Sequence, residues 1–427
     1  MNPVALLFLS FFGLCFLGVP VAVSLGMSAL LTGLMIEIPP LVMVQQMYAM
    51  LDSFTLLAIP LFLLVGIIME YGEITDKLVR FSKTLVGHIR GGLGHVNVFA
   101  NLIMAGISGS ATADAAALGS IMIPAMKKEG YSGAMAAAIN SCAATMGPII
   151  PPSMLMVVYG AYGGVSIAAL FLAGVIPGVI MAGTLMLTIY IWSRRGNFTS
   201  RDNRAPLLEV WAAFKKAALA LVVPILIIGG VLGGKFTATE SGMIAAVYSL
   251  ILTVFVYRTV NLKAFIAILR NSLMSMAAPM FCAAGAGAFG YMMAYLQVPQ
   301  LVLELSGPVN GSPYLTLVFL TAMFLILGCF MDAIPAIIIF LPIAQSLSNA
   351  AGLDPLHVGI LVVVVLCFGF VTPPYGLTML LSSAIAGVNS TETIKASLQF
   401  YITFIFLAFV MIVFPGVILF LPRYFLG

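Results

Sequence analysis

One arrangement of aspartate, glycine and proline residues occurs twice in this chain, at a spacing of 218 to 222 residues. Asp114 and Asp332 each stand ten residues before a proline, and Pro151-Pro152 has its counterpart in Pro373-Pro374. Both copies lie in apolar, glycine-rich sequence. Such a duplication is typical of secondary transporters built from two structural repeats, whose substrate site lies where interrupted helices of the repeats meet.

The composition places this duplicated chain in a lipid bilayer. Of its 427 residues, 62% are hydrophobic and 7% are charged, and the mean hydropathy is +1.17. Soluble domains carry charge on about a quarter of their residues. The net charge of +4 comes from short clusters between apolar runs, so no nucleic-acid partner is expected. The five cysteines stand singly in apolar stretches, which predicts free thiols.

Length and charge predict how the chain crosses the bilayer. A spanning helix needs roughly 20 apolar residues, and short cytoplasmic loops are enriched in Lys and Arg. Four basic clusters are therefore predicted to be cytoplasmic: 77–90, 127–128, the linker 194–216, and 258–270. Three stretches without Lys or Arg are predicted outside, namely 38–53, 298–313 and 346–355. Both termini are then predicted outside as well. The candidate spans are 3–18, 21–37, 54–72, 131–162, 166–192, 217–234, 238–257, 272–296, 356–384 and 396–421.

Two apolar segments are predicted to be re-entrant hairpins rather than spans. The first covers about 93–127 and has thirteen-residue arms on either side of a polar break at 108–113. At 1.5 Å per residue each arm is about 20 Å long, short of a hydrocarbon core of about 30 Å. The second covers about 314–346 and breaks at 328–331. Non-helical backbone at membrane depth must be buried in protein or line a wet cavity.

A broken span follows each hairpin. Consecutive prolines interrupt the spans 131–162 and 356–384. Proline lacks a backbone donor and clashes with the preceding turn, so carbonyl groups are left without intrahelical partners. Each half then holds five spans and one hairpin, and an odd number of spans inverts one half relative to the other. The predicted fold is an all-α polytopic membrane protein with inverted repeats at 1–193 and 217–427.

The charge pattern indicates how a bound acid is neutralised. No Lys or Arg occurs in 91–126, 129–193 or 271–394. Helix N-termini, hydroxyl groups and co-bound cations must therefore compensate an anion at these segments. Sodium takes oxygen ligands, and the carbonyl groups freed at the breaks can supply them. Cation coupling follows as a prediction, and no organic cofactor is expected.

Candidate site residues come from the hairpin tips and the breaks. The first sodium site is predicted at Ser108, Ser110, Gly147 and Ile150, with Asp114 in support. The second is predicted at Gly328, Asp332, Gly369, Thr372 and Pro373. Substrate contacts are predicted from Ser108, Thr112, Ser153 and Thr372. Purely structural roles stay open, since aspartates are good helix N-caps and a proline break can be a packing kink.

These motifs resemble those of the large membrane subunit of tripartite ATP-independent periplasmic (TRAP) transporters. The resemblance runs from end to end, and its most specific segments are 106–114, 147–153, 328–332 and 371–376. It implies a multi-pass protein of the bacterial inner membrane that holds the sodium and substrate sites. It also implies an elevator mechanism, in which the hairpins and broken spans move as one block past the remaining helices.

The resemblance also implies partners and substrates. The expected partners are a separate small four-helix membrane subunit and a periplasmic substrate-binding protein. The expected substrate is an organic acid, with sialic acid (N-acetylneuraminate) first and a C4-dicarboxylate next.

Three other functions stay open. A stand-alone sodium/dicarboxylate symporter would transport without a binding protein, and a passive anion channel would conduct without a coupling ion. A membrane enzyme is the weakest alternative, because the chain offers no clustered catalytic dyad, metal motif or nucleotide loop.

Overall fold

The computed structural model describes residues 2–195, 203–307 and 311–426, and every regular element in these ranges is a helix. Eight of the described helical segments are long and apolar enough to cross a membrane. The prediction of an all-α polytopic membrane protein is confirmed.

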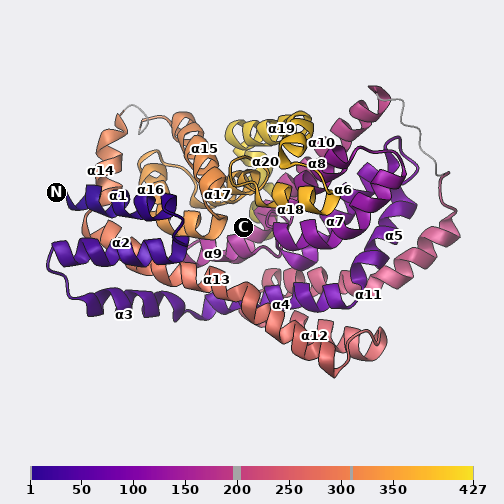
Figure 1. Cartoon of the computed structure of the whole chain (residues 1–427), viewed down its shortest axis with the longest axis horizontal. Coiled ribbons are helices and arrows are strands. Elements are labelled where there is room, and N and C mark those ends of the chain that lie inside the picture. Colours follow the sequence, from indigo (N-terminus) through magenta and orange to yellow (C-terminus); the bar gives the residue numbers. More distant parts are fainter. Residues whose placement is uncertain (1, 196–202, 308–310, 427) are drawn as a thin grey trace.

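One group of helices packs around the long helix α13 and is named the α13 bundle. Figure 1 shows α2, α3 and α4 along α13, in agreement with the contacts of all three with that helix. Helices α11 and α12 extend the bundle by packing on α5 and α4. The members are α1 (Pro3–Phe16), α2 (Val21–Met35), α3 (Pro40–Leu51), the 3-10 turn η1 (Phe54–Leu57), α4 (Ala58–Tyr71), α5 (Ile74–Val86), α11 (Leu207–Leu232), α12 (Ala238–Ile251), the π-helical turn η2 (Leu252–Val256), α13 (Leu262–Tyr295) and α14 (Val298–Leu305).

The second group contains both predicted hairpins and is named the hairpin bundle. Contacts of α18 with α7 and α8, and of α9 with α16, join the two halves of the chain. The bundle meets the α13 bundle most extensively where α5 packs on α6, and also where α4 touches α6 and α9 and where α13 and α14 touch α16. Its members are α6 (Gly92–Ser108), α7 (Ala111–Lys128), α8 (Gly133–Ala144), α9 (Met154–Gly163), α10 (Ile167–Arg195), α15 (Pro313–Phe330), α16 (Ala333–Ala350), α17 (Pro355–Gly369), α18 (Leu377–Ala386), α19 (Ser390–Val413) and α20 (Pro415–Leu426).

Two long helices pack closely on the hairpins and broken helices. Helix α10 packs on α6, α9 and α17, and α19 packs on α8 and α15. Helix α10 makes only slight contact with α11 of the α13 bundle. The reason for the close packing is length and composition, because α10 and α19 are long apolar helices that bury one face against the broken helices.

Two predicted boundaries are wrong. The linker predicted at 194–216 ends at Pro206, because α11 begins at Leu207 and the charges in its first turns lower the hydropathy there. The stretch 38–53, predicted to lie outside, contains α3, which does not bear on that prediction. The span predicted at 396–421 divides at Phe414, because Pro415 supplies no backbone donor to continue α19.

The hairpin arms are also longer than the predicted thirteen residues. Helix α6 has 17 residues and α7 has 18, since both continue beyond the apolar core of the segment, α7 as far as Lys128. In the second hairpin α15 and α16 have 18 residues each. Two residues separate α6 from α7 and two separate α15 from α16. The arms α15 and α16 are each long and apolar enough to cross a membrane, so the length argument for the second hairpin is wrong.

Candidate functional site

The first hairpin reverses at Gly109, whose φ of 61° lies in the left-handed region that favours glycine. A Cβ on Gly109 would come within 2.5 Å of the carbonyl oxygen of Pro152, so the hairpin tip touches the break between α8 and α9. Ser110 is the N-cap of α7 and accepts a hydrogen bond from the Ala113 amide at 3.4 Å. The capping role left open for Asp114 therefore belongs to Ser110.

The second hairpin begins its return arm at Asp332, which is the N-cap of α16. Its Oδ1 accepts a hydrogen bond from the Ala333 amide at 2.7 Å. Asp332 therefore caps α16. Asp332 corresponds to Ser110, because 332 − 110 = 222 is also the spacing between Gly147 and Gly369. The sequence alignment that paired Asp332 with Asp114 is therefore wrong, because it is offset by four residues, about one helical turn.

Glycines allow each break to approach a hairpin at backbone distance. A Cβ on Gly147 would lie 2.8 Å from both Asp114 Oδ2 and the Ser110 carbonyl carbon. A Cβ on Gly328 would lie 3.3 Å from the Cα of Gly369. Side chains at these glycines would separate the breaks from the tips. Gly147 and Asp114 thus form one close-packed junction, and Gly328 and Gly369 form the other.

A cavity of about 370 Å³ lies between the two bundles at the first hairpin tip. Its size falls within the range of roughly 300–1,000 Å³ found for small-molecule sites. One wall belongs to the α13 bundle and the other to the hairpin bundle, which contributes residues from both halves of the chain. The lining residues are Leu63, Gly66, Ile67, Glu70, Ser108, Gly109, Ser110, Ala111, Thr112, Ala113, Pro148, Met154, Leu155, Ser275, Pro279, Asp332, Ile334, Phe370 and Leu377.

Four helix N-termini open onto this cavity. The lining contains Ala111 of α7, Met154 of α9, Ile334 of α16 and Leu377 of α18, each within the first turn of its helix. Free backbone N–H groups and the positive end of the helix dipole favour an anion at such positions. The lining residues include no Lys or Arg, but they include the carboxylates of Glu70 and Asp332. Backbone and hydroxyl groups can therefore hold an anion here together with a cation that compensates these carboxylates.

Asp114 lies behind the first hairpin tip and is completely buried. Its Oδ1 accepts a hydrogen bond from Ser108 Oγ at 2.5 Å, whereas Oδ2 has no hydrogen-bond partner and faces Gly147. A buried carboxylate oxygen without a partner is costly. A cation between Asp114, the tip and the Gly147 backbone would satisfy it, so the donor set here fits a sodium ion.

The predicted site residues divide into those in the cavity and those around it. Ser108, Ser110, Thr112 and Asp332 line the cavity. Gly147, Ile150, Ser153, Gly328, Gly369, Thr372, Pro373 and Asp114 do not.

Two predicted substrate contacts are engaged elsewhere. The buried Ser153 Oγ donates to the Pro148 carbonyl and caps α9 by accepting from the Met156 amide. The Thr372 Oγ1 donates to the Phe368 carbonyl at 2.7 Å. Each hydroxyl group satisfies a carbonyl at its own break, and neither side chain lines the cavity. Ile150 packs against Gly178 of α10, and Pro373 is exposed.

The sequence prediction missed the wall contributed by the α13 bundle. Glu70 of α4 and Ser275 and Pro279 of α13 line the cavity opposite the hairpin tip. Glu70 could have been predicted from the sequence, because an ionisable residue within an apolar span is often functional. Nothing local distinguishes Ser275 from other serines in spans.

Two hydrogen bonds join each hairpin to the broken helix of the opposite half of the chain. Lys127 Nζ donates to the carbonyl of Ala386 at the end of α18, at 2.9 Å. Gln345 Nε2 donates to the carbonyl of Gly163 at the end of α9, also at 2.9 Å. The acceptors are 223 residues apart, at the matching ends of α9 and α18, whereas the donors are 218 apart, about one turn from equivalent positions in α7 and α16. Each hairpin therefore holds the broken helix of the other half.

Buried amide groups add a further connection. Asn140 Nδ2 donates to the Ala115 carbonyl and to Ser382 Oγ, both at 3.0 Å, and Asn140 Oδ1 accepts from Asn97 at 3.2 Å. The network joins α6, α7, α8 and α18. Buried polar networks of this kind specify one arrangement when their members are satisfied.

Two hairpins whose tips meet broken helices around an anion-suited cavity define a class of protein, the permease of a secondary transporter. A family model described as Tripartite ATP-independent periplasmic transporter, DctM component, matches residues 8–417. The chain belongs to this family, as its motifs predicted.

Named relatives cover nearly the whole chain. The sialic acid TRAP transporter large permease protein SiaM of Vibrio cholerae is 35% identical over 97% of both chains. The C4-dicarboxylate TRAP transporter large permease protein DctM of Pseudomonas aeruginosa is 38% identical over 94% of both. The 2,3-diketo-L-gulonate TRAP transporter large permease protein YiaN of Escherichia coli is 34% identical over 88% of this chain and 89% of the relative. These identities do not single out one substrate.

The relatives are transport permeases, so the chain is a transport protein and not an enzyme. The family match and the apolar helices together make it a multi-pass protein of the inner membrane.

Proposed function

We propose that the chain imports an organic acid anion in symport with sodium, by an elevator mechanism, after delivery by a periplasmic binding protein. The observation that carries this proposal is the meeting of four helix N-termini on a cavity whose lining contains no Lys or Arg. Such a cavity can hold a carboxylate, but part of the charge has to be balanced by a co-bound cation.

The first substrate candidate is sialic acid and the second is a C4-dicarboxylate, which are among the substrates named for the relatives. Four hydroxyl groups support a polyhydroxylated acid, those of Ser108, Ser110, Thr112 and Ser275. In this proposal the amides at the start of α7 bind the carboxylate, and the hydroxyl groups bind substrate hydroxyls. The side chains of Leu63, Ile67 and Phe370 exclude water from the remaining surface.

The first sodium site is proposed between Asp114, Ser108, Ser110 and the Gly147–Ile150 backbone. The second is proposed where Gly328 and Gly369 touch, with Asp332 and the carbonyl groups near Thr372 and Pro373. Sodium bound at these places would supply positive charge behind the hairpin tips. Asp114 then keeps its charge in a buried position, and Ser108 stays oriented by its hydrogen bond to Oδ1.

The elevator step is supported by the division of the cavity wall. Glu70, Gly66 and Ser275 belong to the α13 bundle, whereas the anion-binding helix ends belong to the hairpin bundle. A displacement of the hairpin bundle along α4 and α13 would therefore carry the helix ends with the substrate and leave Glu70 behind. A Cβ placed on Gly66 would lie 3.5 Å from the Cα of Ser108. The absence of a side chain at Gly66 thus lets α4 contact the hairpin tip closely along the proposed path of displacement.

The proposed partners are a small four-helix membrane subunit, encoded separately, and a periplasmic binding protein, as a tripartite transporter requires. The exposed apolar side chains of the α13 bundle, such as Leu31, Val44 and Ile266, offer a surface for the small subunit and for lipid.

Transport by reconstituted protein tests the proposal. The chain and its two partners are placed in proteoliposomes, and uptake of labelled N-acetylneuraminate or succinate is measured under an inward sodium gradient. Uptake is expected only with sodium and with the binding protein. Equal uptake in potassium would remove the coupling. Uptake without the binding protein would instead identify a stand-alone symporter, and uptake without any ion gradient would identify a channel.

A further inference from the structure

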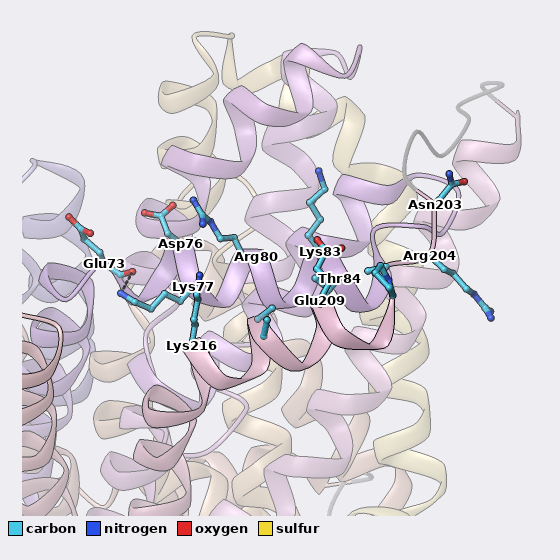
Figure 2. A pocket seen from close by; sticks show the side chains of 14 residues that line it. Glu73, Asp76, Lys77, Arg80, Lys83, Thr84, Asn203, Arg204, Glu209 and Lys216 are labelled. Atoms are coloured by element: carbon cyan, nitrogen blue, oxygen red, sulfur yellow. Dashed lines mark hydrogen bonds between the residues drawn. The ribbon is translucent and has the colours of Figure 1, made fainter.

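A second, larger cavity of about 920 Å³ lies between α5 and α11, and its lining shares no residue with that of the anion cavity. We name it the arm groove. Figure 2 shows Lys77, Arg80 and Lys83 along α5, near α11 with Glu209 and Lys216. The charged residues of the groove are Glu73, Asp76, Lys77, Arg80, Lys83, Arg204, Glu209 and Lys216.

The groove is positively charged overall. Five basic and three acidic side chains line it, which leaves a formal charge of 5 − 3 = +2. Lys77 is partly engaged, since its Nζ donates to the Gly72 and Glu73 carbonyls at 3.4 and 3.3 Å and lies 4.1 Å from the centre of the Tyr257 ring. Arg80 and Lys216 are exposed within the groove. Their charges would attract an anion from outside the protein.

Aromatic packing fixes the spacing between α5 and α11. The ring centroids of Phe81 in α5 and Phe214 in α11 are 5.7 Å apart, and those of Trp211 and Phe214, which stack, are 5.5 Å apart. Helix α5 is amphipathic, with Ile74 and Leu78 completely buried and its basic residues on the opposite face. The cationic groove is thus a built feature of two packed helices.

The position of the groove identifies its occupant as a lipid. Basic clusters mark the cytoplasmic rim of a membrane protein, and Trp is enriched at that interface. Helix α11 passes from the groove directly into an apolar span. The first turns of α11 expose Leu207, Leu208 and Trp211, which are 88%, 80% and 53% accessible, on the face away from the groove. The groove itself offers cationic side chains to a phosphate headgroup at this rim.

We propose that the arm groove binds the phosphodiester headgroup of an anionic phospholipid of the cytoplasmic leaflet, with Arg80, Lys77 and Lys216 as its principal cationic contacts. The bound lipid fixes α5 against α11 at the membrane rim. This site is separate from the transport cavity, and its test does not depend on the identity of the transported acid.

Trp211 provides a local reporter of this lipid. The chain has two tryptophans, and Trp192→Phe leaves Trp211 as the only one. The variant is reconstituted in nanodiscs with increasing fractions of dibrominated phosphatidylglycerol or dibrominated phosphatidylcholine, whose bromines quench nearby tryptophan. The quenching curves give the binding constant of phosphatidylglycerol relative to phosphatidylcholine. A value of at least about fivefold is expected, from the usual gain per basic residue.

Charge variants in the Trp192→Phe background assign the effect to the groove. Combining Lys77→Gln, Arg80→Gln and Lys216→Gln is expected to bring the relative constant close to one. Glu209→Gln removes an acidic residue from the same groove and is expected to raise the constant by about fivefold, a gain that misfolding cannot produce. Lys235→Gln, which follows the other end of α11, is the matched control and is expected to have no effect.

Three results would overturn the proposal. The first is a relative constant of one in the parent protein. The second is an unchanged constant in both the triple variant and Glu209→Gln. The third is relief of phosphatidylglycerol quenching by excess inorganic phosphate, which would assign the groove to a soluble anion. Persistence of the quenching in phosphate supports the lipid.

Discussion

Gly147→Ala tests whether the junction between the first hairpin and the first break holds a cation. A Cβ at Gly147 would lie 2.8 Å from Asp114 Oδ2, 2.8 Å from the Ser110 carbonyl carbon and 2.9 Å from the Ala111 amide nitrogen. Ordinary contact begins at 3.4 Å, so the tip must retreat by about 3.4 − 2.8 = 0.6 Å. Two of the three atoms are backbone atoms, which cannot rotate away.

The displacement is large for a metal site. Ligand distances are held to about 0.2 Å, so a shift of this size removes at least one ligand from the coordination shell. Overpacking of this kind costs about 1–3 kcal/mol. If that cost falls on the bound state, the sodium dissociation constant rises by about 5- to 150-fold.

Thermal unfolding measures this constant without a substrate. A ligand that binds only the folded state raises the melting temperature as its concentration increases. The melting temperature of the purified protein is recorded as sodium replaces potassium at constant total salt, and the sodium concentration of the half-maximal rise is compared between variants. Gly183→Ala is the control, since a Cβ there meets nothing within 4 Å. A folded Gly147→Ala protein with the parental sodium midpoint would refute a cation at this junction.

Three further predictions use the same unfolding assay. Asp114→Asn keeps the shape of the buried side chain but removes its charge, and is expected to weaken sodium binding by at least about tenfold; an unchanged sodium-dependent rise would exclude this carboxylate as a ligand. Gly369→Ala places a Cβ 2.7 Å from the Cα of Gly328, and is expected to destabilise the protein by about 1–3 kcal/mol relative to Gly183→Ala; equal melting temperatures would contradict the backbone contact. Lys127→Met removes the hydrogen bond to the Ala386 carbonyl and is expected to cost about 1 kcal/mol, whereas Lys128→Met next to it is expected to cost little; equal effects of the two would show that the contact contributes nothing.

The places where helices break could be predicted from local sequence. Gly109 and Ser110 suit a left-handed residue followed by an N-cap, and the Pro151-Pro152 and Pro373-Pro374 pairs cannot continue a helix. These effects act over a few residues, so they do not depend on the rest of the fold. The lengths of the helices were less accessible, because α7 and α11 extend through charged turns that a hydropathy reading excludes.

The predicted sodium and substrate residues come from the hairpin tips and the breaks, but which of them line the cavity depends on packing. Ser108 and Thr112 line the cavity, whereas the hydroxyl groups of Ser153 and Thr372 satisfy carbonyls at their own breaks. A serine or threonine at a break can either line the cavity or donate to a nearby carbonyl. Which of these two roles it takes depends on how the neighbouring helix end is capped.

The sequence by itself determined that the protein is helical, lies in a membrane and contains two interrupted copies of one arrangement. Apolar composition, basic clusters and proline chemistry are properties of short segments, and they act in the same way wherever the segment lies. Only the tertiary structure decided that N-termini from α7, α9, α16 and α18 share one cavity, and that α4 and α13 close it. It also decided that Asp332 corresponds to Ser110. These relations join residues about 220 positions apart, and only close packing of the two halves brings them together.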